Sequence, residues 1–165
     1  MTDDAPGYVE LQVTSHFSFL RGASSPEELF AAAALLGLPA LGVVDRNSVA
    51  GIVRAWDAEK TTGVRAIIGC RLDLVDGTAL LVYPTDRAAY GRMCRLLSVG
   101  KARAGKGACH FDWSDVEQWQ EGLPDGSVLL GTTTGSGDGQ VSPVSGCFYS
   151  IFRRRIARHR PAKSG

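Results

Sequence analysis

The sequence predicts an α/β fold, in which strands and helices alternate along the chain. Polar and apolar residues alternate at 10–14, as they do in a strand, whereas apolar residues recur at helical spacing at 49–56. A helix start signal at 25–28 and an Asp-Gly turn at 76–77 separate such segments. The resulting order, strand-helix-strand-helix-strand followed by a hairpin, is typical of α/β proteins.

The first three elements are a strand, a helix and a second strand. We expect the first strand at 10–14 and the first helix at 26–36. Residues 25–28 supply a serine N-cap, a proline at the first helical position and a capping-box glutamate, and Gly37 ends the helix. The next segment, 40–44, is a short apolar run bounded by turn residues, which is the pattern of a strand buried on both faces.

A second amphipathic helix is expected before Gly63. Its apolar residues, Val49, Ile52, Val53 and Trp56, recur at helical spacing. The large indole of Trp56 is expected to anchor this helix in the core.

The strands that follow form a hairpin. A strand is expected at 65–70, and the two arms of the hairpin are expected at 72–75 and 79–83. The Asp-Gly dipeptide at 76–77 lies between the arms and favours a tight turn.

The rest of the ordered chain contains a third helix ending near Gly100, a short helix at 114–120 and a strand at 128–130. After Gly131 the sequence lacks periodicity and apolar content. We therefore expect one domain at 8–131, a disordered N-terminus at 1–7, and a disordered low-complexity and basic tail at 132–165. The third helix is marked by Ala88, Ala89, Arg92, Met93, Leu96 and Leu97.

Composition bounds the class of protein. With 165 residues and 44% hydrophobic content, the chain can build one core. Its four cysteines lack Cys-x-x-Cys spacing, so neither a zinc knuckle nor a disulfide framework is expected. The longest apolar run is interrupted by Gly37 and Pro39 and is too short to span a bilayer. We expect a cytoplasmic protein with no membrane contact.

Charge is distributed unevenly. Residues 146–165 hold six of the 18 basic residues and no acidic residue, which leaves the rest of the chain with a net charge near −5. A negative net charge disfavours a nucleic-acid surface on the globular part, because such surfaces cluster basic residues against phosphates. The basic tail itself could bind nucleic acid through counterion release.

Four blocks of sequence, at 8–24, 42–51, 67–74 and 83–98, occur in an order and spacing that resemble one family. They begin Tyr8-Val9-Glu10-Leu11, Gly42-Val43-Val44-Asp45, Ile67-Ile68-Gly69-Cys70 and Tyr83-Pro84-Thr85-Asp86. The blocks resemble the N-terminal PHP (polymerase and histidinol phosphatase) domain of bacterial family C DNA polymerases, and most of all its error-prone, translesion branch. The resemblance covers roughly residues 8–130.

The resemblance implies a fold and a function. The expected fold is a partial PHP-type βα barrel, an incomplete and distorted relative of the TIM barrel, because a closed barrel needs about 250 residues. The expected function is that of a truncated PHP-like fragment of an error-prone DNA-directed DNA polymerase involved in translesion synthesis and DNA damage tolerance. Expected partners are the polymerase's palm, thumb and fingers, with DNA reached through the parent enzyme. Nucleotidyl transfer and its magnesium belong to the missing palm, so no cofactor and no catalytic residue are expected in this chain.

The family's metal-binding positions are altered here. Where the resemblance implies His-x-His, Asp-His and a glutamate, this sequence has Gln12 and Thr14, Asp45 and Arg46, and Arg71. Amides and hydroxyls are poor ligands for transition metals, and guanidinium groups stay positively charged. We therefore expect a degenerate site that holds no metal, in which an ion pair of Asp45 with Arg46 or with Arg71 could replace the structural role of the metal.

Two other functions remain as alternatives. The first is a metal-dependent PHP phosphoesterase or 3′–5′ exonuclease, which the altered positions disfavour. The second is an interaction module that acts through its basic tail.

Four further features have plain structural explanations. His16 is not expected to be a ligand, and Cys109-His110 is expected to be a loop pair rather than a nucleophile and its base. Asp73 and Asp76 flank a turn that favours aspartate, and the segment 105–107 is a flexible link that lacks the P-loop context.

Overall fold

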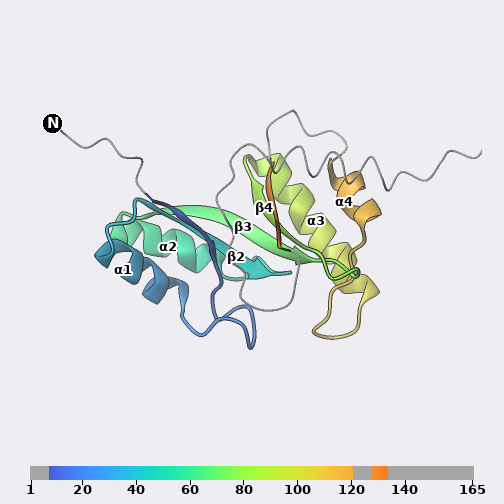
Figure 1. The fold of residues 1–165 in the computed structure, drawn as a ribbon, viewed down its shortest axis with the longest axis horizontal. Helices are drawn as coiled ribbons and strands as arrows, with labels where there is room; N and C mark the ends of the chain where they lie inside the picture. Colours follow the sequence, from blue (N-terminus) through green and yellow to red (C-terminus); the bar gives the residue numbers. More distant parts are fainter. Residues whose placement is uncertain (1–7, 121–127, 134–165) are drawn as a thin grey trace, which may run out of the picture. The chain divides into compact units, whose positions relative to one another are not determined.

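The computed structural model describes residues 8–120 and 128–133 (Figure 1). The chain divides into two compact units, at 1–71 and 72–165. The expected tail at 134–165 and N-terminus at 1–7 lie outside the described residues.

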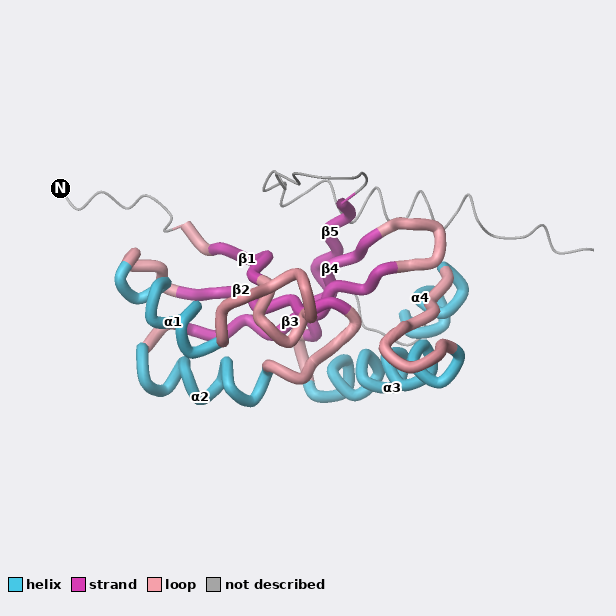
Figure 2. Tube along the Cα trace, turned by 90° about the horizontal axis from the view of Figure 1, so that it is seen from below, coloured by secondary structure: helices cyan, strands magenta, loops and turns pink. Residues whose placement is uncertain are grey.

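The first unit consists of parallel strands joined by helices. Strand β1 pairs with β2, and β2 pairs with β3, both in parallel. Both helices lie on one face of these strands (Figure 2). A parallel pair requires a crossover connection, and each helix supplies one. The mixed α/β class is therefore confirmed. The elements are β1 (Glu10–Val13), α1 (Pro26–Leu35), β2 (Ala40–Arg46), α2 (Ile52–Thr62) and β3 (Arg65–Asp73), the last of which runs into the second unit.

Helix α1 begins as its sequence predicts. Ser25 Oγ accepts a hydrogen bond from Glu28 N–H (3.2 Å), and Ser25 N–H donates to Glu28 Oε2 (2.9 Å). This capping box satisfies two backbone groups at the helix start. At the other end, Gly37 adopts a φ of +69°, a left-handed conformation that glycine adopts without strain.

The core of the first unit lies between the helices and β2. Phe30 and Ala33 of α1 pack with Leu41 and Val43 of β2, and α2 contributes small side chains. Leu41 and Val43 are two residues apart and therefore share the face of the sheet that the helices cover.

The prediction that Trp56 anchors this core is wrong, although its helix forms. Trp56 is 53% exposed, and the Lys60 ammonium lies 3.4 Å from the centroid of its ring. The buried residues of α2 are Ala55 and Ala58. Small side chains let the helix pack closely on the core, and the indole turns outward where a cation covers its face.

The described part of the second unit contains a turn, an antiparallel strand pair and two helices. The expected Asp-Gly turn is confirmed: Leu74 N–H donates to Thr78 O (2.8 Å), and Gly77 has a φ of +83°. Strand β4 pairs antiparallel with β5, with Val82 opposite Leu130. The elements of this unit are β4 (Ala79–Pro84), α3 (Arg87–Arg103), α4 (Trp113–Gln120) and β5 (Val128–Thr133).

Several element boundaries differ from the predicted ones, among them the ends of α3 and β5. Helix α3 continues past Gly100 to Arg103. Gly100 is a packing residue and not a helix stop, because a Cβ there would lie 2.1 Å from Phe111 Cε1. Strand β5 continues through Thr132 and Thr133, which the sequence analysis placed in the tail. Within the described residues, none of the helices combines the length and the hydropathy needed to cross a membrane.

Candidate functional site

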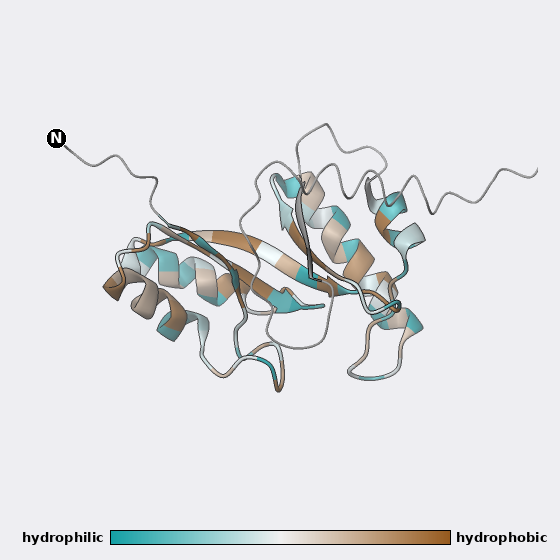
Figure 3. Cartoon of the chain, viewed as in Figure 1, coloured by the Kyte–Doolittle hydropathy of each residue, from teal (hydrophilic) through white to brown (hydrophobic). Residues whose placement is uncertain are grey.

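The sequence-predicted site lies at the carboxyl ends of β1 and β2. Strand β2 is hydrophobic along most of its length and becomes hydrophilic at its C-terminal end (Figure 3). Asp45 and Arg46 occupy that end, and the loop at 14–24 follows the end of β1. Ligands of α/β sheets typically bind at this edge.

Asp45 is buried there and is held by two serines. Its side chain is 3% exposed. Oδ1 accepts hydrogen bonds from Ser15 N–H (2.9 Å) and Ser18 Oγ–H (2.8 Å), and Oδ2 accepts one from Ser15 Oγ–H (2.8 Å). These three residues, Ser15, Ser18 and Asp45, form what we call the serine–aspartate knot. Its donors are neutral and compensate the burial of a carboxylate through hydrogen bonds alone.

The knot fixes the loop after β1 to the end of β2. Arg46 N–H donates to Ser18 Oγ (2.8 Å), and Phe17 N–H donates to Ser15 Oγ (3.2 Å), so each hydroxyl both donates and accepts. A Cβ at Gly51 would lie 2.9 Å from Asp45 Oδ2. The backbone at Gly51 therefore approaches this carboxylate so closely that a side chain there would collide with it.

The expected degenerate metal site has five positions that do not share one face, namely Gln12, Thr14, Asp45, Arg46 and Arg71. In β2, Asp45 has the same parity as Leu41 and Val43 and lies on the helix-covered face, whereas Arg46 lies on the opposite face. The parallel register places Arg46 beside Arg71 of β3. The two guanidinium-bearing residues are thus brought together, as the sequence implied, but on the face that Asp45 does not use.

The two remaining positions belong to β1 and its end. Val13 packs against the core on the helix-covered face, and Gln12 precedes it where the register of β1 against β2 is irregular, between Glu10 and Val13. Thr14 follows the strand and is half-buried. In the described residues Asp45 is held by serines, which corrects the expectation that it pairs with Arg46 or Arg71.

These residues do not fit a transition metal. Among residues 8–120 and 128–133, no group of three or more His, Cys, Asp or Glu side chains could hold an ion. Both oxygens of Asp45 already accept hydrogen bonds, and the neighbouring positions offer an amide, a hydroxyl and two cations. The described part of the chain therefore supplies no ligand set for a metal-dependent reaction at this edge.

The other sequence candidates have structural roles. His16 stacks on Phe17, with ring centroids 4.5 Å apart, and its backbone N–H donates to Ser24 O. Asp76 shapes the turn, since Oδ1 accepts from Thr78 N–H (2.9 Å) and Oδ2 accepts from Trp113 Nε1–H (2.9 Å). The turn explanation for this carboxylate is therefore confirmed.

The Cys109-His110 pair and the segment 105–107, both predicted to be loops, make different backbone contacts. His110 N–H donates to Gly100 O (2.9 Å), which ties the Cys109-His110 segment to α3. In the segment 105–107, Gly107 adopts a φ of +83° beside a turn closed by Ala108 N–H and Gly105 O (3.1 Å). The structure thus describes this segment as a hydrogen-bonded turn.

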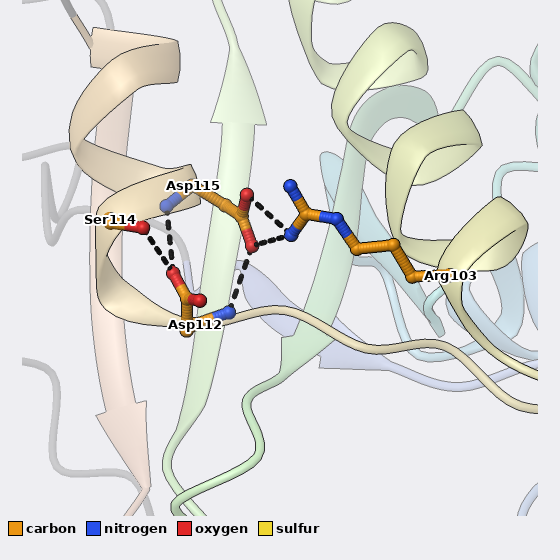
Figure 4. Close-up of polar contacts among 4 residues, drawn as sticks. All are labelled: Arg103, Asp112, Ser114 and Asp115. Carbon is orange, nitrogen blue, oxygen red and sulfur yellow. Dashed lines mark hydrogen bonds and ion pairs between the residues drawn. The ribbon is translucent and has the colours of Figure 1, made fainter.

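The second unit holds a polar cluster that sequence reasoning missed. Arg103 Nη1 donates to both oxygens of Asp115 at 2.7 Å (Figure 4). Asp112 caps α4 by accepting from Asp115 N–H (3.1 Å), and Ser114 Oγ–H donates to Asp112 Oδ1 (2.6 Å). The Ser114 hydroxyl, followed by the Asp115 amide, lowers the pKa of Asp112. The Asp-x-x-Asp spacing at 112–115 is the signal that could have revealed this cap.

The same reasoning missed the serine–aspartate knot. Ser15 and Ser18 are visible in the sequence only as members of a motif, and nothing local indicates that they bind a residue about 30 positions away. Burial of Asp45 inside an apolar strand is the signal that could have prompted a search for its donors.

Comparisons with known proteins identify relatives. The model of the PHP domain family matches residues 10–158. The chain is 66% identical over 119 residues to error-prone DNA polymerase 1 of Agrobacterium fabrum, a match that covers 72% of this chain and 11% of that protein. It is 58% identical over 118 residues to the error-prone DNA polymerase of Caulobacter vibrioides, covering 71% and 11%. The chain thus spans about a tenth of the length of these relatives.

One solved structure supports the fold. A "putative metal-dependent phosphoesterase" from Bifidobacterium adolescentis superposes with a TM-score of 0.51 and 19% identity, over 72% of this chain and 45% of that one. At this level of identity the similarity concerns the fold alone. The resemblance carried by the four sequence blocks is confirmed by the polymerase relatives.

Proposed function

The chain belongs to the PHP domain family, and from that premise we propose that it is the PHP-like part of an error-prone DNA-directed DNA polymerase, in which it acts as a scaffold for the polymerase core without chemistry of its own. High identity to error-prone polymerases supports the parentage. The scaffold role would place the chain among proteins of translesion synthesis and DNA damage tolerance.

The serine–aspartate knot carries the proposal that the domain is not catalytic. A hydrolytic PHP site would need free carboxylates and imidazoles around a metal. Here both oxygens of the buried Asp45 already accept hydrogen bonds from Ser15 and Ser18, and Arg46 and Arg71 add positive charge on the opposite face of the sheet. A carboxylate used in this way stabilises the loop after β1 and is not available to an ion.

The proposed fold of the longer protein is a PHP-type βα barrel of which this chain forms part. The parallel order of β1, β2 and β3 with helical crossovers, and the superposition on the phosphoesterase, support it. The remaining strands would come from elsewhere in such a polymerase.

Partners and cofactor follow from the same premise. The palm, thumb and fingers of the polymerase would contact this domain, and DNA would be engaged by the assembled enzyme in the cytoplasm. Magnesium would be held by palm aspartates and would support in-line nucleotidyl transfer there.

A chimeric polymerase tests the scaffold role. The matching segment of the Agrobacterium fabrum polymerase is replaced by residues 8–130 of this chain, and primer extension is measured. We expect extension close to that of the unaltered enzyme, because a scaffold requires only packing. An Asp45→Ala version should lose extension together with soluble yield. A chimera that is soluble and binds primer but does not extend it would contradict the proposal.

A second measurement addresses the phosphoesterase alternative. Manganese retained after dialysis is compared between the chain and a variant with Gln12→His, Thr14→His, Arg46→His and Arg71→Glu. We expect retention only in the variant. Stoichiometric retention by the unaltered chain, with phosphate released from a chromogenic monoester, would favour the alternative instead.

A further inference from the structure

The second unit segregates its charges along the sequence. All six basic residues of its described part lie within 87–106, and no acidic residue lies between them. The six acidic residues of the described part lie outside that stretch and cancel its charge in a sum over 72–120 and 128–133. A near-zero or negative net charge therefore conceals a local basic region. The basic residues are Arg87, Arg92, Arg95, Lys101, Arg103 and Lys106, and the acidic ones are Asp73, Asp76, Asp86, Asp112, Asp115 and Glu117.

Helix α3 presents part of this charge to solvent. One stripe of the helix is buried and contains Met93, Leu96 and Leu97. Arg87, Arg95 and Lys101 are exposed on the rest of the helix, and Lys106 is exposed in the turn that follows. We call these four residues the α3 basic face. Arg103 is not counted, because Asp115 holds its guanidinium.

The residues between these cations are small. The helix surface between the long basic side chains carries short side chains. These exposed small residues are Ala88, Gly91, Ser98 and Ala102. A helix of 17 residues is about 25 Å long, and at its rise per residue Arg87 and Arg95 are about 12 Å apart along the axis, whereas Arg95 and Lys101 are about 9 Å apart. Along the α3 basic face, long basic side chains therefore alternate with small residues that do not obstruct the approach of a ligand.

We propose that the α3 basic face binds the phosphate backbone of nucleic acid. A duplex is a rod with one negative charge per about 1.7 Å, so it can lie along such a face and exchange counterions for lysine and arginine. The contacts would be to phosphates and would carry no base specificity. The binding would go beyond the scaffold role and does not depend on it.

An acidic peptide fits this face less well than a nucleic acid. Peptides that bind helix surfaces usually bury apolar anchor side chains in addition to pairing charges. On the exposed side of α3, Val99 is the one large hydrophobic residue that is more than a third exposed. Charge complementarity without an apolar anchor favours a polyanion with regular charge spacing.

Salt-dependent binding of a labelled DNA duplex tests the proposal. Anisotropy titrations of the full chain with a duplex of about 20 base pairs are repeated at several KCl concentrations. The variant Arg95→Ala/Lys101→Ala should weaken binding roughly tenfold and reduce the slope of log K against log salt by about 2, since each lost phosphate contact removes about one unit. Alanine preserves helix propensity, so α3 should remain folded, which circular dichroism verifies.

A matched variant separates this face from general charge. Arg21→Ala/Arg65→Ala removes two exposed cations of the first unit and changes net charge equally, while the basic residues at 153–160 stay in both variants. We expect this control to retain most of the affinity and slope. Equal losses in both variants, or an unchanged slope in Arg95→Ala/Lys101→Ala, would overturn the proposal.

A competition experiment with polyglutamate tests whether the α3 basic face prefers nucleic acid to other polyanions. Polyglutamate of matched charge is added to the preformed complex, and displacement of the duplex is compared with that by unlabelled duplex. Much weaker displacement by polyglutamate supports the proposal. Equal displacement would show that any polyanion suffices and would overturn the assignment to nucleic acid.

Discussion

In the part of the chain that the structure describes, each unit buries one aspartate, and the two carboxylates are stabilised differently. Asp45 in the first unit is 3% exposed and, among the described residues, accepts its hydrogen bonds from Ser15 and Ser18. Asp115 in the second unit is 6% exposed and is held by Arg103 and by the Asp112 amide. A buried carboxylate therefore needs donors but does not require a cation, whether guanidinium or metal.

The two aspartates also differ in how far along the sequence their side-chain donors lie. The serine donors of Asp45 come from a loop about 30 residues away, so they fix tertiary structure, whereas Arg103 is 12 residues from Asp115 and joins consecutive helices. Arg103 is 49% exposed, so solvent screens its ion pair. The knot in the first unit should therefore contribute more stability and respond less to salt.

The largest expected effect is that of Asp45→Ala. The change leaves the buried hydroxyls of Ser15 and Ser18 and one backbone amide without their acceptor, and we expect the free energy of unfolding to fall by about 3 kcal/mol or more. Urea unfolding in the presence of a chelator measures it. The control Asp57→Ala removes an exposed partner of Lys60 and should cost less than about 1 kcal/mol. Equal losses for both variants would show that the knot does not stabilise the unit.

The second largest expected loss of stability comes from packing between α3 and Phe111 in the second unit. Gly100→Ala would place a methyl group 2.1 Å from Phe111 Cε1, and we expect a loss of about 1–3 kcal/mol from overpacking. Gly91→Ala in the same helix meets nothing within 4 Å and should stabilise by about 1 kcal/mol. Thermal unfolding of the two variants provides the comparison. A Gly100→Ala protein as stable as the parent would mean that α3 does not contact Phe111 this closely.

The ion pair of the second unit should contribute less than the knot. Arg103→Ala leaves Asp115 with one backbone donor, and we expect a loss of about 1–2 kcal/mol that shrinks as salt is added. Arg95→Ala on the exposed face of α3 serves as the control and should change stability by less than about 0.5 kcal/mol. If the stability lost in Arg103→Ala does not change with salt, the Arg103–Asp115 ion pair is shielded from solvent, as the hydrogen bonds of Asp45 are expected to be.

The smallest effect is a pH dependence at the start of α4. The pKa of Asp112 is lowered in the folded state, so its contribution is present above the unfolded pKa and is lost as pH falls through the folded value. Asp112 is exposed, so the contribution should stay below about 1 kcal/mol. Carboxyl NMR titration should show the pKa of Asp112 rising towards its ordinary value in Ser114→Ala. An unchanged pKa would assign the shift to the backbone amide of Asp115 instead.

The sequence alone determined the order of elements and the chemistry of the altered positions. The capping box at 25–28, the Asp-Gly turn and the residue types at positions 12, 14, 46 and 71 are local facts, because each can be read from residues that are close in the chain. Only the tertiary structure decided that Trp56 faces solvent, that Gly100 is a contact and that serines hold Asp45. Those outcomes depend on which distant segments meet, and helical or strand periodicity does not specify the partner that a buried face will find.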